Sequence, residues 1–179
     1  NTSDYTTIYN FEPLNSLNGT WPIGGLLLDT NNILYGVTYS GGINNNGVIF
    51  QFTPSSNTYS KKIDFENSIN GIEPYSGLHL ANDNNFYGTT YYGGTNLNGV
   101  IYKYNPMTNV YTKLHDFNGA NGSNPISRLT ETGNKLYGTT YYGGTNDLGT
   151  SFEYDLDPNN VDPFTKKLDF NGTNGKNPN

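Results

Sequence analysis

The sequence contains no cysteine in its 179 residues and carries little charge of either sign. The absence of cysteine excludes disulfides, thiolate zinc sites and cysteine nucleophiles. Charged residues make up 13% of the chain, well below the usual quarter, and the formal net charge is −6. A basic surface for nucleic acid is therefore not expected, and nucleic acid is not among the predicted partners.

Long hydrophobic runs are also missing. No stretch approaches the ~18 apolar residues of a membrane-spanning helix, so this segment is not expected to insert into a membrane. Aromatic residues, in contrast, reach 15% of the chain, and glycine is frequent. Because disordered chains are poor in aromatics and carry high net charge, this composition indicates a folded, β-rich domain with many tight turns.

An internal repeat dominates the chain. The tetrapeptide Tyr-Gly-x-Thr occurs three times, each time followed by Gly-Gly, and its glycine falls at Gly36, Gly88 and Gly138. A period of 50 to 52 residues is typical of repeat architectures. We interpret residues 1–179 as a single repeat domain that is part of a larger propeller, with units at approximately 22–65, 74–117 and 125–170.

Each unit divides into four β-like segments. The first follows a proline, the second contains Tyr-Gly-x-Thr, the third alternates apolar and polar residues, and the fourth ends in Asp-Phe. The fourth segments carry five of the eight lysines: Lys61, Lys62, Lys113, Lys166 and Lys167. Because lysine on a strand blocks edge-to-edge pairing, the fourth strand is predicted at the outer edge, with the third strand pairing with both the second and the fourth.

These features predict an all-β fold, a β-propeller of four-stranded antiparallel blades. It is incomplete, with three blades plus one extra strand, a lone outer strand at residues 4–11. A solenoid is the alternative. A closed propeller typically has 4–8 blades, so the open ends are expected to pack against the remaining blades of the same chain or a partner protein. Residues 171–179 repeat the lead-in at 118–125, which suggests a further unit.

The motif Leu136-Tyr-Gly-Thr-Thr-Tyr-Tyr-Gly-Gly, followed by Gly149-Thr-Ser-Phe-Glu-Tyr, resembles the GloVer-type bacterial tandem repeat. The resemblance covers nearly the whole chain, in three successive copies of the motif. It implies a large secreted or cell-surface protein exported by a bacterium, and it says little about activity. The first copy departs from the pattern at Val37 and Ser40, and the third at Ser151, all changes that a strand tolerates.

The best ligand-binding candidates are tyrosines that precede the Gly-Gly pairs and asparagines in the loops that follow. Aromatic faces stack on sugar C–H groups, and amides bond to hydroxyls, so this combination suits surface glycans. The other interpretation places these tyrosines in the core between blades. The candidate residues are Tyr91, Tyr92, Asn96, Tyr141, Tyr142 and Asn146.

No catalytic residue, metal ligand or cofactor site is predicted. His79 and His115 lie in different segments and do not recur, and no strained nucleophile turn accompanies them. Aspartates at positions 64, 116 and 169 recur once per unit, which distributes them around a ring, whereas a glycosidase needs two carboxylates in one cleft. A structural role is therefore expected for both sets.

The leading functional hypothesis is a non-catalytic repeat module that serves adhesion, display or protein–protein interaction. A carbohydrate-binding, lectin-like propeller is the first alternative, and a glycan array would separate the two. A fragment of a secreted enzyme with its active site outside this segment is the second alternative.

Overall fold

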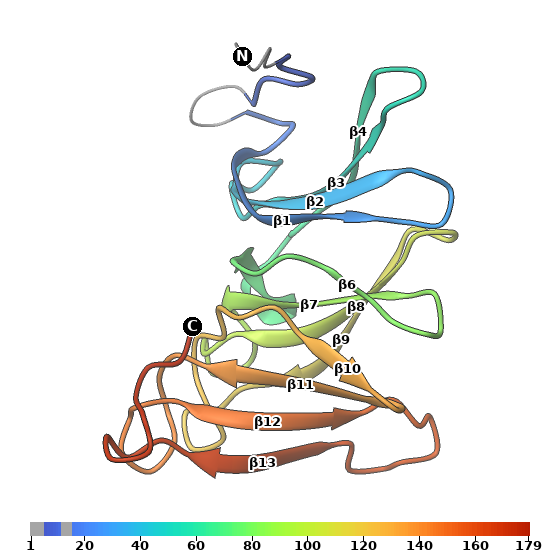
Figure 1. Ribbon diagram of the computed structural model, residues 1–179. Helices are drawn as coiled ribbons and strands as arrows, with labels where there is room; N and C mark the ends of the chain where they lie inside the picture. The colour runs from blue at the N-terminus through green and yellow to red at the C-terminus, as the bar shows by residue number, and fades with distance from the viewer. Residues whose placement is uncertain (1–5, 12–15) are drawn as a thin grey trace, which may run out of the picture.

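The computed structural model describes residues 6–11 and 16–179, which form three antiparallel sheets that follow one another along the chain (Figure 1). The sheets do not close into a ring. The first contains β1 (Thr20–Leu28), β2 (Leu34–Ser40), β3 (Val48–Thr53) and β4 (Thr58–Asp64), in that order. The fold is that of an incomplete β-propeller, as the sequence predicted.

The other two sheets repeat this plan. The second contains β5 (Ile72–Pro74) and β6 (His79–Leu80), which both pair with β7 (Phe86–Tyr92), followed by β8 (Val100–Asn105) and β9 (Val110–Asp116). The third contains β10 (Thr130–Thr132), β11 (Lys135–Thr140), β12 (Thr150–Asp155) and β13 (Phe164–Asp169). The 3-10 turn η1 (Ser68–Asn70) precedes the second sheet. Within the described residues, no helix has the length and apolarity needed to cross a membrane.

The strand order confirms the position predicted for the lysine-bearing strands. β4, β9 and β13 are outermost, and each third strand pairs with both the second and the fourth. A lysine in each outer strand forms an ion pair with the aspartate three residues later, at 2.8 to 2.9 Å. The pairs are Lys61–Asp64, Lys113–Asp116 and Lys166–Asp169.

The first strand is less regular than the sequence pattern suggested. In the second sheet it is interrupted between β5 and β6, where Pro74 supplies no backbone N–H to the ladder. The Ser76 hydroxyl instead lies 3.2 Å from the Thr89 hydroxyl of β7. Ser127 and Thr139 form the matching contact in the third sheet, at 2.8 Å. Side-chain hydroxyls thus replace part of the backbone pairing.

The glycine of Tyr-Gly-x-Thr marks a close approach between neighbouring strands. A Cβ atom at Gly88 would lie 2.5 Å from the hydroxyl of Tyr102, the aromatic residue opposite it on β8. Gly36 and Gly138 are covered in the same way by Phe50 and Phe152. The repeat motif therefore places an aromatic ring of the third strand over a bare backbone in the second.

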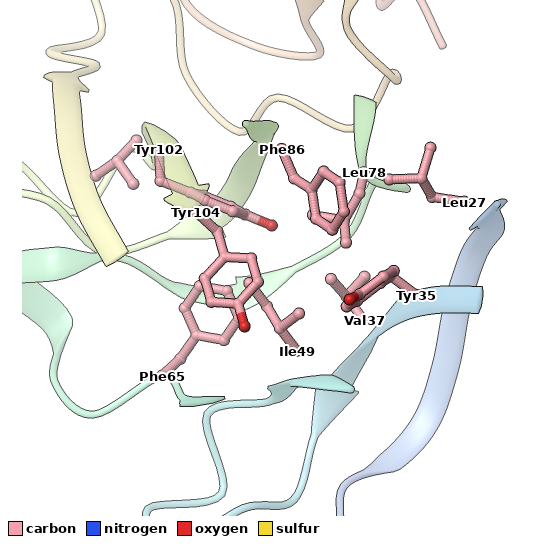
Figure 2. Packing of buried hydrophobic residues seen from close by; sticks show 10 residues of the cluster. Leu27, Tyr35, Val37, Ile49, Phe65, Leu78, Phe86, Tyr102 and Tyr104 are labelled. Carbon is pink, nitrogen blue, oxygen red and sulfur yellow. The ribbon is translucent and has the colours of Figure 1, made fainter. Parts of the chain in front are cut away.

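The hydrophobic core lies between successive sheets. One buried cluster joins the first and second sheets (Figure 2), and another joins the second and third. In the first cluster, Tyr35, Val37 and Ile49 of one sheet pack with Phe86, Tyr102 and Tyr104 of the next. Each internal sheet face is thus covered by its neighbour, which explains why the second strands carry bulky residues on both sides.

The Asp-Phe segments supply the aromatic contact between sheets. Phe65 meets Tyr102 edge-on in the next sheet, at 5.5 Å between ring centroids, and Phe117 meets Phe152 at 5.2 Å. Phe11 makes the same contact with Phe50, at 5.1 Å. The prediction of a lone strand over residues 4–11 is wrong in its described part, residues 6–11, which form no strand. Those residues have no sheet to pair with and pack through their side chains; residues 4 and 5 lie outside the described part.

Candidate ligand-binding surface

Seven aromatic side chains form a continuous surface at one end of the second strands. We call this set the aromatic row. Trp21 lies almost parallel to Tyr39, with ring centroids 6.1 Å apart. Successive centroids are then 5.9 Å apart from Tyr39 to Tyr75, and 5.7 Å apart from Tyr75 to Tyr91. The row consists of Trp21, Tyr39, Tyr75, Tyr91, Tyr92, Tyr141 and Tyr142.

The row continues from the second sheet to the third. Tyr91 contacts Tyr92 at 4.5 Å, and Tyr141 contacts Tyr142 at 4.6 Å, both edge-on. Burial raises the pKa of Tyr91, and the nearby hydroxyls of Tyr92 and Tyr142 raise it further. The two pairs are joined through Asn124, whose side chain donates to the Tyr91 carbonyl and whose carbonyl accepts from the Tyr141 backbone N–H, so all three sheets contribute to the row.

Solvent reaches much of the row. Trp21 is 62% exposed, and three of its tyrosines are 40% to 42% exposed, namely Tyr75, Tyr92 and Tyr142. Tyr91 and Tyr141 are half-buried. The internal core tyrosines, in comparison, are almost fully buried. The row is thus open to a ligand, whereas the aromatic residues between the sheets are not.

In the second and third sheets, the residue before the repeat proline directs its side chain toward the preceding sheet, whereas Trp21 in the first sheet packs on Tyr39 of its own sheet. Trp21, Glu73 and Asn124 all have a left-handed backbone, with φ of 53°, 57° and 54°. The Asn124 side chain donates to the Tyr91 carbonyl at 3.0 Å, which fastens the third sheet to the second. An aromatic residue in this conformation is unusual and strained, so Trp21 is held by its surroundings.

Glu73, which occupies in the second sheet the position that Asn124 has in the third, adds a carboxylate to the row. Its side chain accepts a hydrogen bond from the Tyr39 hydroxyl at 2.5 Å. Burial, together with the Glu73 carboxylate, raises the pKa of Tyr39 above its ordinary value. The carboxylate thus lies at the Tyr39 hydroxyl, within a row in which Trp21 and Tyr75 remain partly exposed.

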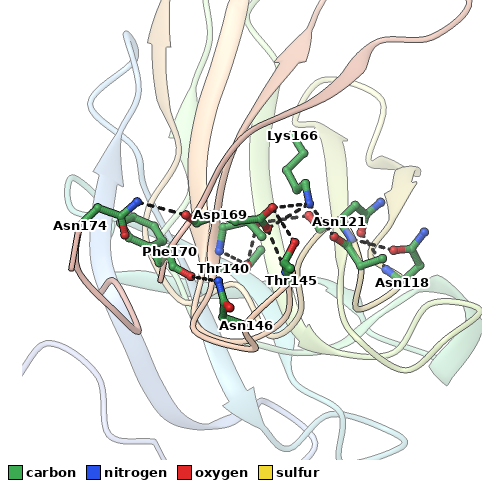
Figure 3. A network of polar contacts seen from close by, with 11 residues as sticks. Asn118, Asn121, Thr140, Thr145, Asn146, Lys166, Asp169, Phe170 and Asn174 are labelled. Atoms are coloured by element: carbon green, nitrogen blue, oxygen red, sulfur yellow. Dashed lines mark hydrogen bonds and ion pairs between the residues drawn. The ribbon is translucent and has the colours of Figure 1, made fainter. Parts of the chain in front are cut away.

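The predicted residues are only partly brought together. Tyr91, Tyr92, Tyr141 and Tyr142 lie in one row, but Asn146 turns toward the outer strand, where its side chain donates to the Phe170 carbonyl at 3.3 Å (Figure 3). Asn96, at the equivalent position, is exposed. The Asn146 amide is therefore tied to the end of the outer strand and does not join the tyrosines.

Sequence reasoning missed Trp21, Tyr39, Tyr75 and Glu73. One signal was present, because Trp21 and Tyr75 are the direct neighbours of the repeat prolines. Their convergence depends on how consecutive sheets are stacked, which a pattern within one repeat does not contain.

The recurring aspartates have structural roles. Asp169 accepts from the Thr145 backbone at 3.2 Å and from Lys166 at 2.9 Å (Figure 3). Asp64 and Asp116 make matching contacts. Each carboxylate thus joins the Gly-Gly loop to the outer strand, and the three are separated by whole sheets.

The two histidines also lie in separate surroundings. His79 Nε2 is 3.2 Å from Glu131, in the next sheet. The ring of His115 stacks on Phe164 at 3.8 Å, and burial lowers its pKa to about 4. Among the described residues, no group of three or more histidine, aspartate or glutamate side chains converges as metal ligands would.

Comparison with known proteins identifies the repeat family and similar folds. A family model described as the Gloeobacter/Verrucomicrobia repeat matches residues 1–152 and 70–179, and so covers the whole chain. A search of curated proteins gave no match.

Among solved structures, a chain of a nidogen/laminin complex is similar with a TM-score of 0.59 and 16% identity, over 89% of this chain and 50% of that one. TolB from Acinetobacter baumannii is similar with a TM-score of 0.52 and 18% identity, over 78% of this chain and 30% of TolB. At these identities, the likeness shows the propeller-like fold alone. The chain described here spans half or less of each of these structures.

Proposed function

Because the chain belongs to the Gloeobacter/Verrucomicrobia repeat family, we propose that it is a non-catalytic interaction module of a large secreted or cell-surface bacterial protein. Its propeller-like sheets serve as a scaffold, and the aromatic row is the contact surface. A similar sheet arrangement occurs in a chain solved within a nidogen/laminin complex, which is in keeping with a protein partner.

The exposure of the aromatic row is the observation that carries this proposal. Large aromatic side chains are the usual energetic centres of interfaces, because they bury much area at little entropic cost. Trp21 is 62% exposed even though its backbone conformation is strained. The same left-handed conformation recurs at Glu73 and Asn124, so it belongs to the repeat, and it is the exposed indole that marks Trp21 as a contact residue.

The test is an array that carries extracellular proteins and oligosaccharides side by side. We expect the chain to bind protein spots, and the double variant Trp21→Ala/Tyr75→Ala to lose about tenfold or more in affinity. The matched control is Leu97→Ala, since Leu97 is 59% exposed but lies outside the row. Equal binding by the double variant and the control would refute the role of the row.

Glycan binding is the second candidate, and it has an observation of its own. One face of the Trp21 indole lies against Tyr39, the indole is 62% exposed, and the Tyr39 hydroxyl is bonded to the Glu73 carboxylate. This arrangement suits stacking on a sugar ring with a hydroxyl bonded to the carboxylate.

The chain has a single tryptophan, so its fluorescence reports on this site without labelling. Titration with oligosaccharides should shift the emission of Trp21 and saturate, and Glu73→Gln should weaken the binding. Binding confined to protein spots, with no saturable change in emission upon sugar addition, would eliminate this candidate.

A further inference from the structure

Tyr39 is the residue at which the first and second sheets meet in the aromatic row. Its ring lies almost parallel to that of Trp21, at an interplanar angle of 20°, and perpendicular to that of Tyr75, at 88°. Its hydroxyl donates to the Glu73 carboxylate of the second sheet. Trp21 and Tyr75 are 62% and 40% exposed. Two exposed rings and one carboxylate therefore converge on a single tyrosine.

The Glu73 carboxylate has no basic partner within the part of the chain that the structure describes. The Tyr39 hydroxyl bonds to its Oε2 atom, and no donor among the described residues reaches Oε1. Burial and this hydrogen bond raise the pKa of Tyr39, so the phenol stays neutral and the pair carries one negative charge. The ion pairs of the described residues all involve other carboxylates, namely Asp64, Asp116, Glu131, Glu153 and Asp169.

The fold itself does not call for a negative charge at this position. Asn124 occupies it in the third sheet, and its amide donates to the Tyr91 carbonyl of the preceding sheet at 3.0 Å. Asn177 makes the matching bond to the Tyr141 carbonyl at 2.9 Å. A carboxylate cannot donate such a bond. Glu73 thus replaces a stabilising contact between sheets with a charge on the aromatic row.

We propose, on the basis of the function proposed above, that Tyr39 and Glu73 mark the subsite for an arginine side chain of the partner protein. A guanidinium group is planar, stacks on aromatic rings and donates paired N–H groups to a carboxylate. At this subsite it packs against the exposed rings of Trp21 and Tyr75 and donates to Oε1 of Glu73. A neutral sugar gains nothing from the uncompensated charge, and a lysine ammonium lacks the flat surface for stacking.

Charges elsewhere in the chain act on this contact in opposite directions. The net charge of −6 favours the approach of a basic partner. Arg128, in contrast, lines a cavity together with Tyr75 and opposes a second positive charge there. The variant Arg128→Gln is therefore expected to bind an arginine peptide about twofold more tightly. Weaker binding by this variant would mean that Arg128 contacts the ligand, and would contradict a subsite selective for cations.

A pair of peptides tests the charge directly. The blocked peptide Ala-Ala-Arg-Ala-Ala should change the fluorescence of Trp21, the single tryptophan, and saturate with a dissociation constant on the order of 1 mM. The same peptide with citrulline in place of arginine keeps the shape and loses the charge, so it should bind about tenfold more weakly. Equal binding of the two peptides, or no saturable binding of the arginine peptide, overturns the proposal.

Three variants test the role of the carboxylate. Glu73→Gln should weaken binding of the arginine peptide about fivefold or more, since it removes the charge and retains the shape of the side chain. Glu66→Gln is the matched control, because Glu66 is an exposed carboxylate outside the aromatic row. Equal effects of these two substitutions would reduce the contribution of Glu73 to net charge and refute the subsite.

Tyr39→Phe separates recognition by the carboxylate from a merely structural role. This variant keeps the ring and releases Oε2 of Glu73, so binding of the arginine peptide should stay within about twofold of that of the unmodified chain. If Glu73 only held Tyr39 in place, Tyr39→Phe would weaken binding as much as Glu73→Gln does. That result would overturn the proposal.

The array of extracellular proteins distinguishes failure of this inference from failure of the proposed function. Both hold if Trp21→Ala/Tyr75→Ala and Glu73→Gln weaken binding to the same protein spots and the arginine peptide competes for them. Loss of binding in the double variant alone, with Glu73→Gln equal to Glu66→Gln, leaves the row as the contact surface and refutes the arginine subsite. Unchanged binding in the double variant refutes the proposed function and, with it, the partner named here.

Discussion

At the scale of single residues, Tyr102 stands out because its phenol is fully buried and its hydroxyl has no hydrogen-bond partner among the described residues. The equivalent positions hold Phe50 and Phe152, which bury the same ring without a polar atom. Tyr104, two residues later, donates its hydroxyl to Asn109 at 2.7 Å. Both tyrosines thus bury a hydroxyl, but only that of Tyr104 has a hydrogen-bond partner.

We expect Tyr102→Phe to raise the free energy of unfolding by about 1 kcal/mol, since it removes an unsatisfied buried hydroxyl and leaves the packing unchanged. Tyr104→Phe should lower it by about 1 kcal/mol, because it breaks a hydrogen bond and leaves the Asn109 amide oxygen without its donor. Urea denaturation of both variants provides the measurement. A loss of stability in Tyr102→Phe equal to that in Tyr104→Phe would show that the Tyr102 hydroxyl does have a partner.

His115 makes stability depend on pH. Burial lowers its pKa to about 4, and its Nε2 atom lies 3.0 Å from the Asn121 amide nitrogen, a donor that favours the neutral ring. Since the pKa of an unfolded histidine is about 6.5, the unfolded state takes up the proton first as the pH falls. This contribution is therefore present above pH ~6.5 and is lost progressively down to about pH 4.

The expected loss is about 2 kcal/mol, after allowance for the partial exposure of the ring. Leucine occupies the equivalent repeat position, residue 168. The variant His115→Leu should therefore lack this pH-dependent contribution to stability. Unfolding free energies of both proteins at about pH 7 and pH 4.5 give the comparison. Equal pH dependence in the two proteins would assign the effect to carboxylates instead.

At the scale of elements, the outer strands act as clamps as well as protected edges. In each outer strand, the lysine that pairs with the aspartate also donates a hydrogen bond to a backbone carbonyl in the loop that leads into its own sheet, at 2.8 to 3.1 Å. The bonds are Lys61 to Leu17, Lys113 to Ile69, and Lys166 to Ala120. The lysine pattern predicted where these strands lie, but not this contact, because the loop returns to the strand from more than forty residues away.

The phenylalanine that ends each outer segment can be replaced by alanine both between two sheets, at Phe117, and at the outer side of the third sheet, at Phe170. Phe117→Ala should lower the free energy of unfolding by about 3–4 kcal/mol, because it opens a cavity between two sheets. Phe170→Ala, in the same motif but with no sheet after it, should cost less than about 1.5 kcal/mol. Thermal and urea unfolding of the two variants should separate the two costs. Equal costs would mean that Phe117 is not a contact between sheets.

At the scale of the whole molecule, the repeat determined most of what could be predicted. The spacing of Gly36, Gly88 and Gly138 identified the propeller, and the lysines identified the strand order. The interruption of the first strand depends on Pro74 and on contacts between side-chain hydroxyls. The pattern shared by the three repeats does not show these contacts. The aromatic row was found only in part, because Trp21 and Tyr75 meet its other members through the stacking of sheets.

Stacking also predicts how stability is distributed along the molecule. In an array of repeats, each unit is stabilised chiefly by its neighbours, so the unit with two neighbours is the most stable. The second sheet is covered on both faces, whereas the first exposes Leu26 and the third exposes Leu168. Opening of either end sheet exposes one internal interface, while opening of the middle sheet exposes two.

Amide hydrogen exchange followed by mass spectrometry should therefore show the slowest exchange in β7 and β8 of the second sheet. The equivalent strands β2 and β3 should exchange faster, and so should β11 and β12. These strands share the same internal hydrogen-bond pattern, so a difference between them reports on stacking and not on pairing within a sheet. Uniform protection across all three sheets would mean that the molecule opens only as a whole.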